Sequence, residues 1–381
     1  MSFEGMPAVA KKWAKALSMA ACALQRLLLL VVGRGALCFE LVGDEAVWDK
    51  IFMAQEAELC ATGFQWPEGP TWTSKGLIFS DTISGKLYRW DEEAFEAKVL
   101  VEGAGGCPKE AEAEDDTYEC DATQAEPGSN GISKEMFYIK NAKPSKRVAL
   151  CQHGARRLAF MDVDSLEITP LTGYFRGLRH NGPNDVVLYD NKGSLFFTDP
   201  YYALLEKDRF YDHAYTDAKS EIGYAGVYRY NHRDNTTYLL HNGTERPNGL
   251  AFLKDRKQLA VSDCCQGASP TCPAGAARWN IFDVARAGFS LKHAKLIEHE
   301  DHVTAGCADG FKYHSWFDVL VASCPGGVCV VGLDGEGGVL AKLHFGHSVA
   351  NVELGGGYAW FTGGGSLYRI RLQEKPQEAE L

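Results

Sequence analysis

Six short segments of the sequence repeat one arrangement, in which a polar residue beside a small turn residue opens an alternating apolar run. Glu68 lies in the first, Pro67-Glu68-Gly69-Pro70-Thr71-Trp72, and Asp309 in the fifth, Ala308-Asp309-Gly310-Phe311-Lys312. Turn formation alone explains Asn or Asp at such positions, but Glu is a poor turn former. The carboxylate of Glu68 is therefore predicted to be used. The six polar residues, 42 to 64 positions apart, are Glu68, Asn130, Asn184, Asn248, Asp309 and Asn351.

The runs that follow these segments predict the elements that position them. Each segment is followed after roughly ten residues by a short run rich in β-branched and aromatic residues, such as Leu77 to Ser80 and Leu195 to Thr198, and several show a third, such as Ser366 to Ile370. Strands prefer these residues. Repeated multi-strand units with Gly and Asn turns predict a β-propeller, and six copies predict six blades. We expect an all-β, six-bladed β-propeller over residues 40–372, followed by a polar tail at 373–381.

A closed ring would bring the six polar residues together, because the residue that opens each innermost strand points to the same central channel. The prediction is thus a central site built from residues far apart in the sequence. No Gly-x-Ser-x-Gly elbow occurs, and the cysteines lack the contexts of known cysteine nucleophiles. A nucleophile supplied by the protein is therefore disfavoured.

The charge of the chain bears on its partners. Its 39 Lys and Arg against 50 Asp and Glu give a net charge of −11, which repels phosphate backbones and anionic lipids. Nucleic acid is not expected as a partner. Seven of the acidic residues fall between 110 and 121, and this run is predicted to be a solvated loop, since it lacks the ligand order of a calcium-binding loop.

The N-terminal segment, residues 1–39, predicts secretion. Lys11, Lys12 and Lys15 precede an apolar stretch from Ala16 to Val32, which Arg26 interrupts. This pattern fits a signal peptide or signal anchor better than an ordinary membrane helix, and an amphipathic targeting helix is the alternative. No later segment reads as transmembrane. We expect a secreted or secretory-pathway protein, with a cytoplasmic location as the alternative.

Twelve cysteines are many for a reduced cytosolic enzyme. No CxxC pair and no His at finger-like spacing supports a zinc site, so some disulfides are predicted. The cysteines that lie close in sequence or bracket the acidic run are Cys264 with Cys265 and Cys272, Cys324 with Cys329, and Cys107 with Cys120.

The segments resemble the gluconolactonase and senescence marker protein (regucalcin-like) family of six-bladed propellers, and more closely its fungal lactonohydrolases. The resemblance covers about residues 64 to 372, and this many motifs in family order at blade spacing are a specific signal. The motifs that carry it are Glu68-Gly69-Pro70-Thr71-Trp72, Ser80-Asp81, His153-Gly154-Ala155-Arg156-Arg157-Leu158, Asn181-Gly182-Pro183-Asn184-Asp185-Val186, Phe197-Thr198-Asp199-Pro200, Arg246-Pro247-Asn248-Gly249-Leu250 and Asp309-Gly310.

The resemblance implies a divalent metal at the channel mouth, held by Glu68, Asn184, Asn248 and Asp309. Two carboxylates and two carboxamides are hard oxygen donors with a combined charge of −2, which suits Ca²⁺ better than zinc or copper. Zn²⁺ and Mg²⁺ are the alternatives for the cofactor.

The resemblance also implies contacts with substrate. Asn130 and Asn184 are predicted to contact substrate. Animal members have a substrate-contacting Arg two residues before the Asn of the third segment, where this chain has Gly182. Arg179 and His180 are the candidates to substitute for it, and His180 is predicted to contact substrate. Long insertions at 103 to 127 and 264 to 278 are expected to reshape the rim around the site.

The expected activity is hydrolysis of a sugar-derived or related aldonolactone by metal-activated water. Asp309 is the candidate general base, or the ligand that orients the water, and the two roles conflict because a calcium-bound carboxylate is a weaker base. One alternative is an arylesterase or phosphotriesterase using the same metal. The other is a calcium-binding propeller that binds a partner without turnover.

Overall fold

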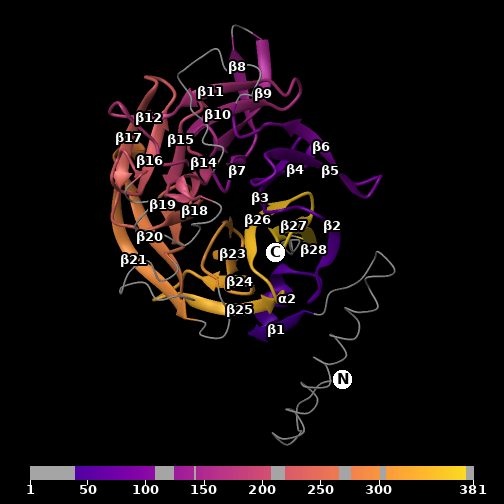
Figure 1. Cartoon of the computed structure of the whole chain (residues 1–381). Coiled ribbons are helices and arrows are strands. Elements are labelled where there is room, and N and C mark those ends of the chain that lie inside the picture. Colours follow the sequence, from indigo (N-terminus) through magenta and orange to yellow (C-terminus); the bar gives the residue numbers. More distant parts are fainter. Residues whose placement is uncertain are drawn as a thin grey trace, which may run out of the picture.

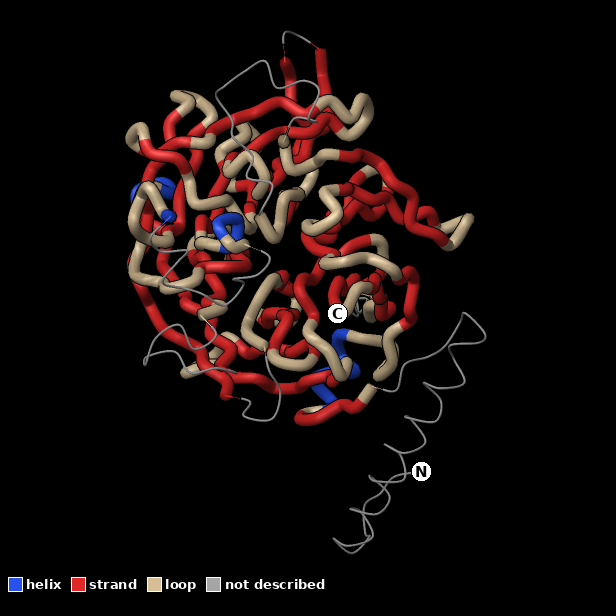
Figure 2. Tube along the Cα trace, viewed as in Figure 1, coloured by secondary structure: helices blue, strands red, loops and turns tan. Residues whose placement is uncertain are grey.

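A computed structural model describes residues 39–107, 124–140, 143–206, 219–265, 276–300 and 306–374. Six antiparallel sheets lie around a central axis, so the predicted all-β, six-bladed propeller is confirmed (Figure 1). Strands and loops make up almost all of the described chain, with short helical turns between them (Figure 2). Most of the N-terminal segment, the acidic run at 110–121 and part of each predicted insertion lie outside the described residues. None of the helices in the described part is long and apolar enough to cross a bilayer.

The first four blades along the chain each run from an innermost to an outermost strand. Blade 1 contains β3 (Pro67–Thr73), β4 (Gly76–Asp81), β5 (Lys86–Asp91) and β6 (Glu96–Glu102). Blade 2 contains β7 (Ser129–Ile132), β9 (Lys143–Gln152), β10 (Arg157–Asp162) and β11 (Ile168–Thr172), with β8 (Met136–Lys140) also paired to β9. Blade 3 contains β14 (Val186–Leu188), β15 (Leu195–Asp199), β16 (Gly226–Asn231) and β17 (Thr236–His241). Blade 4 contains β18 (Pro247–Leu253), β19 (Gln258–Asp263), β20 (Ala276–Ala285) and β21 (Ser290–Glu300).

The last two blades take their outermost strands from the N-terminal side of the chain. Blade 5 contains β22 (Phe311–His314), β23 (Val319–Cys324), β24 (Gly327–Gly332), β25 (Gly338–His344) and, at its edge, β1 (Glu40–Gly43). Blade 6 contains β26 (Val349–Gly355), β27 (Tyr358–Gly363), β28 (Ser366–Arg371) and β2 (Glu58–Thr62). The pairing of β2 with β28 joins the two ends of the propeller and closes the ring.

The remaining short elements lie between the blades or on their edges. The helix α2 links β1 to β2, and its Trp48 and Ile51 are buried between blades 5 and 6. These elements are α2 (Glu45–Ile51), β12 (Tyr174–Phe175), β13 (Leu178–Arg179), η1 (Tyr202–Leu204) and η2 (Arg286–Gly288).

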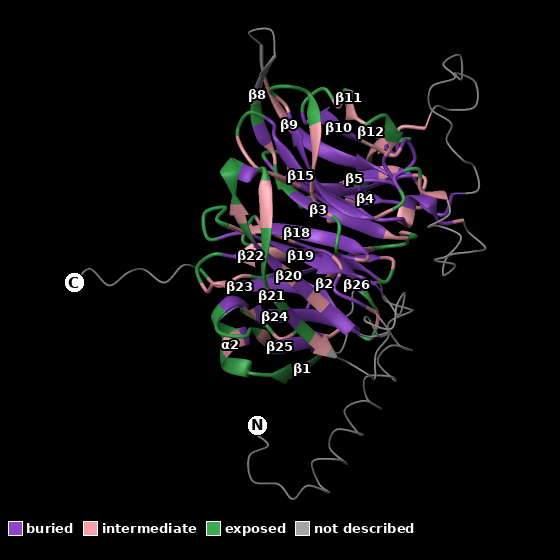
Figure 3. Cartoon of the chain, turned by 90° about the vertical axis from the view of Figure 1, so that its left-hand side faces the viewer, coloured by how far each residue is buried: buried purple, intermediate pink, exposed green. Residues whose placement is uncertain are grey.

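The apolar core is divided among the six interfaces between neighbouring blades. Between blades 6 and 1, for example, Phe79 and Trp90 pack with Trp360. The middle strands are buried on both faces because each lies against a blade on either side, whereas the exposed residues concentrate in turns and outer edges (Figure 3). The interfaces therefore bury the apolar area, and the axis is left to polar side chains.

Arg369 of β28 makes hydrogen bonds that stabilise the closure of the propeller. Its Nε donates to Glu58 Oε2 of β2 at 2.7 Å, and its Nη1 donates to both carboxylate oxygens of Glu92, which follows β5 of blade 1. The guanidinium also lies 4.3 Å from the centre of the Tyr358 ring. Arg369 is only 6% exposed. One buried cation thus connects the closing strand, blade 6 and blade 1.

We expect Arg369→Ala to lower the free energy of unfolding by about 2 kcal/mol, because it removes charged hydrogen bonds and a cation–π contact at the closure. Arg371→Ala is the matched control, since Arg371 lies on the same strand but is exposed, and its loss should cost less than about 0.5 kcal/mol. Urea unfolding curves measure both. Equal midpoints for the two variants would contradict a role of Arg369 in closure.

Candidate active site

All six polar residues singled out in the sequence lie at the same end of the innermost strands. Glu68, Asn130 and Asn248 are the second residues of β3, β7 and β18. Asn351 is the third residue of β26, and Asn184 and Asp309 lie two residues before β14 and β22. In β3, β7, β18 and β26 the pairing register shifts at this point. Such irregularities re-aim side chains out of the ladder, here into the channel mouth.

Hydrogen bonds join these six residues, called the ring from here on, in two series around the channel mouth. Asn130 Nδ2 donates to Asn184 Oδ1 at 2.7 Å, and Asn184 Nδ2 donates to Asn248 Oδ1 at 2.6 Å. The side chain of Asn248 in turn hydrogen-bonds the carboxylate of Asp309. On the other side of the ring, Asn351 Nδ2 donates to Glu68 Oε2 at 3.1 Å. The structure therefore brings together all six polar residues of the repeat, Asn351 included, at the channel mouth.

Hydroxyl groups on the second strand of several blades fix the backbone of the ring. Ser80 Oγ lies within hydrogen-bond distance of the carbonyl oxygens of Glu68 and Asn130, at 3.1 and 3.0 Å. Thr198 Oγ1 donates to the carbonyl of Asn248 at 2.6 Å, and Ser262 Oγ donates to that of Asp309 at 2.8 Å. Each of these hydroxyls reaches from one blade to the ring residue of the next. The spacing between ring residues is thereby set by the contacts between blades.

An Asp that follows the hydroxyl residue holds the loop before the innermost strand. Asp81 accepts hydrogen bonds from the backbone N–H groups of Gln65 and Trp66, at 3.1 and 2.8 Å. Asp199 accepts from Asn181 and Gly182, and Asp263 accepts from Arg246. The Ser80-Asp81, Thr198-Asp199 and Ser262-Asp263 pairs are visible in the sequence, but only the structure shows that they position the ring.

The ring concentrates negative charge in a buried place. Glu68 is 2% exposed, and burial, with the charges of Asp185 and Glu126, raises its pKa to about 8 against the lowering effect of hydrogen bonds from Asn351 and Gly69. Burial also raises the pKa of Asp309, and the negative charges of Glu68, Glu126 and Asp185 raise it further. The strongest charges acting on Asp309 are thus carboxylates, and a bound cation would relieve their repulsion.

The donor atoms of the ring suit a hard cation. Both hydrogen bonds to Glu68 are accepted by Oε2, so Oε1 accepts none from the described residues. No three His, Cys, Asp or Glu side chains of the described ranges are grouped as a metal site. A cation at the ring would therefore depend on carboxamide oxygens from Asn in addition to the two carboxylates, which is a donor set that calcium accepts.

His180, predicted to contact substrate, lies in the packing of blade 3. Its Nδ1 is 3.1 Å from Asp199 Oδ2, and its ring meets the rings of Phe197 and Tyr228 edge-on. None of its hydrogen bonds within the described residues reaches the ring of polar side chains. At Gly182, a Cβ would collide with that of Ala203, so the position where related chains have Arg has no room for a side chain here.

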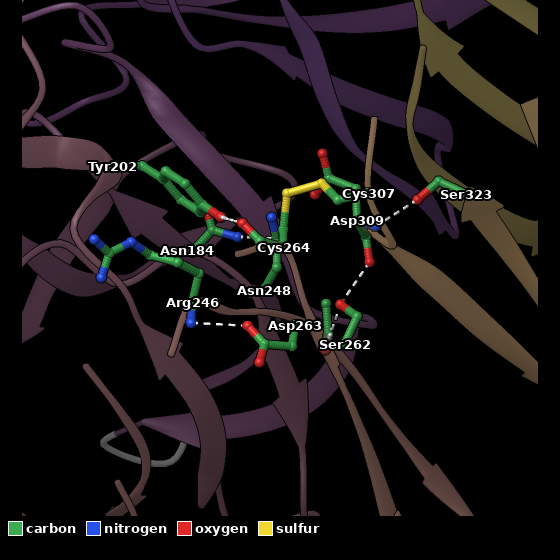
Figure 4. The surroundings of a disulfide bond; sticks show 11 residues. Asn184, Tyr202, Arg246, Asn248, Ser262, Asp263, Cys264, Cys307, Asp309 and Ser323 are labelled. Atoms are coloured by element: carbon green, nitrogen blue, oxygen red, sulfur yellow. Dashed lines mark hydrogen bonds between the residues drawn. A yellow bond between two sulfur atoms is a disulfide. The ribbon is translucent and has the colours of Figure 1, made fainter. Parts of the chain in front are cut away.

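Tyr202 and a disulfide complete the mouth on the side of blades 4 and 5, and the sequence did not single out Tyr202. Its hydroxyl donates to the carbonyl of Cys264 at 3.1 Å, and its side chain hydrogen-bonds Asn248. Figure 4 shows Tyr202 beside Asn184, Asn248 and the Cys264–Cys307 disulfide, which links the loop that follows β19 of blade 4 to the segment that precedes β22 of blade 5. Disulfides were predicted, and Cys264–Cys307 and Cys324–Cys329 confirm this; Cys60 and Cys151 are free.

Comparisons with known proteins match the region that contains the ring. A sequence model described as the SMP-30/gluconolactonase/LRE-like region matches residues 66–359. A gluconolactonase of Zymomonas mobilis subsp. mobilis is 28% identical over 324 residues, which cover 83% of this chain and 81% of the relative. Among solved structures, a gluconolactonase of Xanthomonas campestris is 22% identical with a TM-score of 0.66, over 89% of this chain and 96% of its own. A calcium-binding protein, regucalcin, of Agrobacterium tumefaciens is 12% identical with a TM-score of 0.54, over 86% and 95%. The two structures establish a shared fold.

We expect Glu68→Gln to raise the free energy of unfolding by about 1–2 kcal/mol at pH 7 when a chelator is present. Gln keeps the size of the side chain, but no carboxylate has to be buried beside Asp309. Glu336→Gln, at an exposed turn, is the control and should change stability by less than about 0.5 kcal/mol. Denaturant unfolding in chelator measures both. A loss of stability in Glu68→Gln would show that the charge is compensated within the protein itself.

Proposed function

Because this chain belongs to the SMP-30/gluconolactonase/LRE-like family, we propose that it is a lactone hydrolase that opens a sugar-derived aldonolactone at the channel mouth. The observation that carries the proposal is the hydrogen-bonded ring of carboxylates and carboxamides, all of which lie inside the region that matches the family. The Zymomonas mobilis relative bears the name gluconolactonase, which supports the substrate class.

We propose Ca²⁺ as the cofactor, held by Glu68, Asn184, Asn248 and Asp309. The support is the fit of the donor set described above: hard oxygen atoms, a net charge of −2, and carboxylates whose repulsion a cation relieves. When bound, the cation supplies Lewis-acid polarisation of the lactone carbonyl. The regucalcin relative is described as a calcium-binding protein.

The chain's own residues bind and orient the substrate. The carboxamide groups of Asn130 and Asn351 can donate hydrogen bonds to sugar hydroxyls and accept hydrogen bonds from them. The side chain of Tyr202 hydrogen-bonds Asn248, another ring residue. The ring residues are largely buried, so a bound lactone would be shielded from bulk water. Asp309 is the less buried of the two ring carboxylates, and we assign to it the orientation of the attacking water.

Hydrolysis then proceeds without a covalent intermediate on the protein. The water oxygen bonds to the carbonyl carbon, the ring C–O bond breaks, and the product is a hydroxy acid. The free thiols of the described residues are poor nucleophiles, because burial raises the pKa of Cys60 to about 12 and holds that of Cys151 well above its usual value. Direct attack by water is thus the simplest route.

We expect Asp309→Ala to lower kcat/KM for glucono-1,5-lactone at least about 100-fold, because it removes the group that orients water and half of the carboxylate charge. Asp334→Ala, in an exposed turn, should match the wild type. A pH-stat records the acid released, and circular dichroism checks folding. Full turnover by folded Asp309→Ala would remove this residue from the mechanism.

An aryl ester and an aryl phosphotriester in the same assay test the two alternative hydrolase activities.

We also expect Ca²⁺ to raise the melting temperature of the wild type, by an amount equivalent to about 2.7 kcal/mol at 100 times its Kd. The shift should be lost in a Glu68→Gln, Asp309→Asn double variant, which retains the size of both side chains. Chelator should abolish lactone hydrolysis, and added Ca²⁺ should restore it. A calcium-dependent shift without turnover of any substrate would instead support a binding protein.

A further inference from the structure

We propose that the imidazole of His153, held by the carboxylate of Glu126, is the proton acceptor for the water that attacks the lactone. The inference rests on the proposed lactonase function and assigns the general base of that site to a pair of residues outside the ring. Glu126 is a positioning residue in this assignment, and His153 is the catalytic one.

His153 and Glu126 are both buried, and the imidazole Nε2 of His153 has no hydrogen-bond partner within the described residues. His153 is 0% exposed and Glu126 is 7% exposed. His153 Nδ1 lies 2.8 Å from Glu126 Oε2, while His153 Nε2 has no hydrogen-bond partner within the described residues. A buried polar atom without a partner is costly to folding, and a catalytic role or contact with a bound molecule is one explanation for such an atom. Nε2 is therefore free to receive a proton.

The repeat of the propeller places His153 at the mouth. Its backbone N–H donates to the carbonyl of Gly128, two residues before the ring residue Asn130. In blade 4, the N–H of Cys264 makes the same bond to Arg246, two residues before the ring residue Asn248. Figure 4 shows Cys264 among the residues of the mouth, bonded to Cys307 and in contact with Tyr202, which also hydrogen-bonds Asn248. By the equivalence of the blades, His153 occupies the corresponding position beside Asn130.

Electrostatics places the partner of His153 near the same centre. The charge of Glu126 raises the pKa values of both Glu68 and Asp309, although these two residues belong to blades 1 and 5. Glu126 is itself buried, so its charge is poorly screened by solvent. Glu126 lies four residues before Asn130, in the loop that leads into β7.

The arrangement suits proton transfer. The Glu126 carboxylate accepts from Nδ1–H, which leaves Nε2 as the unprotonated nitrogen. As the water oxygen bonds to the carbonyl carbon, one water proton moves to Nε2. When the ring C–O bond breaks, that proton passes to the ring oxygen, which becomes a hydroxyl, and the carboxylic acid product releases its remaining proton to solvent. With the base outside the ring, Asp309 can serve as a ligand without a conflict of roles.

A structural role for the pair is the competing explanation. In blades 1, 3 and 4 an Asp at the end of the second strand holds the preceding loop, but blade 2 has Gln152 at that position. The Gln152 side chain instead donates to the carbonyl of Ala104 and accepts from Arg157. The Glu126–His153 pair could replace the missing clamp, so the test must separate chemistry from loop anchoring.

The test is chemical rescue in the full-length protein. We expect His153→Ala to lower kcat for glucono-1,5-lactone at least about 100-fold with KM within about threefold, and added imidazole to restore at least about tenfold. Glu126→Gln should lower kcat by about tenfold without rescue by imidazole. His314→Ala is the matched control, because His314 is also buried with an unpartnered ring nitrogen but ends β22 at the strand terminus away from the mouth. Its kcat should equal that of the wild type. Imidazole without enzyme gives the background rate.

The outcomes are distinguishable. Wild-type kcat in His153→Ala, or a loss that imidazole does not restore, overturns the assignment and favours the clamp. The calcium-induced rise in melting temperature should persist in His153→Ala, which shows that the site is intact when turnover is lost. If the wild type hydrolyses no lactone, the proposed function itself fails and the role of His153 falls with it.

Discussion

Everything at the centre of the molecule depends on the antiparallel pairing of β2 with β28, because a propeller has a channel mouth only when its first and last blades meet. The pairing unites residues from opposite ends of the chain, and Arg369 connects it to blade 1. Once the ring is closed, contacts between neighbouring blades determine the distances between ring residues. Hydroxyls such as those of Ser80, Thr198 and Ser262 transmit that spacing directly, since each bonds the backbone of a ring residue in the next blade. The geometry of the site therefore depends both on the closure of the propeller and on the packing between its blades.

The electrostatics of the mouth follows from the same geometry. Carboxylates that are far apart in the sequence share a poorly solvated space, where burial and the neighbouring negative charges raise the pKa values of Glu68 and Asp309. Amide side chains occupy the other ring positions, and they can both donate and accept hydrogen bonds without adding charge. The ring thus combines two carboxylates, Glu68 and Asp309, that attract a cation with neutral carboxamides that can hydrogen-bond sugar hydroxyls. This combination supports the proposed metal-assisted lactonase, in which a base outside the ring accepts the proton.

Much of this could be predicted from the sequence, for a definite reason. The polar residue that opens each innermost strand recurs at blade spacing, so the sequence alone predicts that Glu68, Asn184, Asn248 and Asp309 lie together. The repeat could not reveal β1 and β2, which precede the first segment and carry none of its signals, nor Tyr202 and Glu126, which lie in connecting segments without periodicity. His180 shows the opposite difficulty. It stands near a ring residue in sequence, but its side chain packs between Phe197 and Tyr228, because short sequence distance does not fix the direction of a side chain.

The partition of the apolar core among the blade interfaces has a consequence for how such a protein can diverge. Among the residues that the structure describes, no hydrophobic cluster spans the axis, so substitutions in the connecting segments around the channel mouth leave the apolar interfaces between blades intact. Substitutions or insertions in those segments can thus change the ligand preference with little loss of the free energy of unfolding. Substitutions at the interfaces between blades are tolerated less well, because each blade packs against two neighbours. A packing defect at one interface therefore also disturbs the adjacent blades.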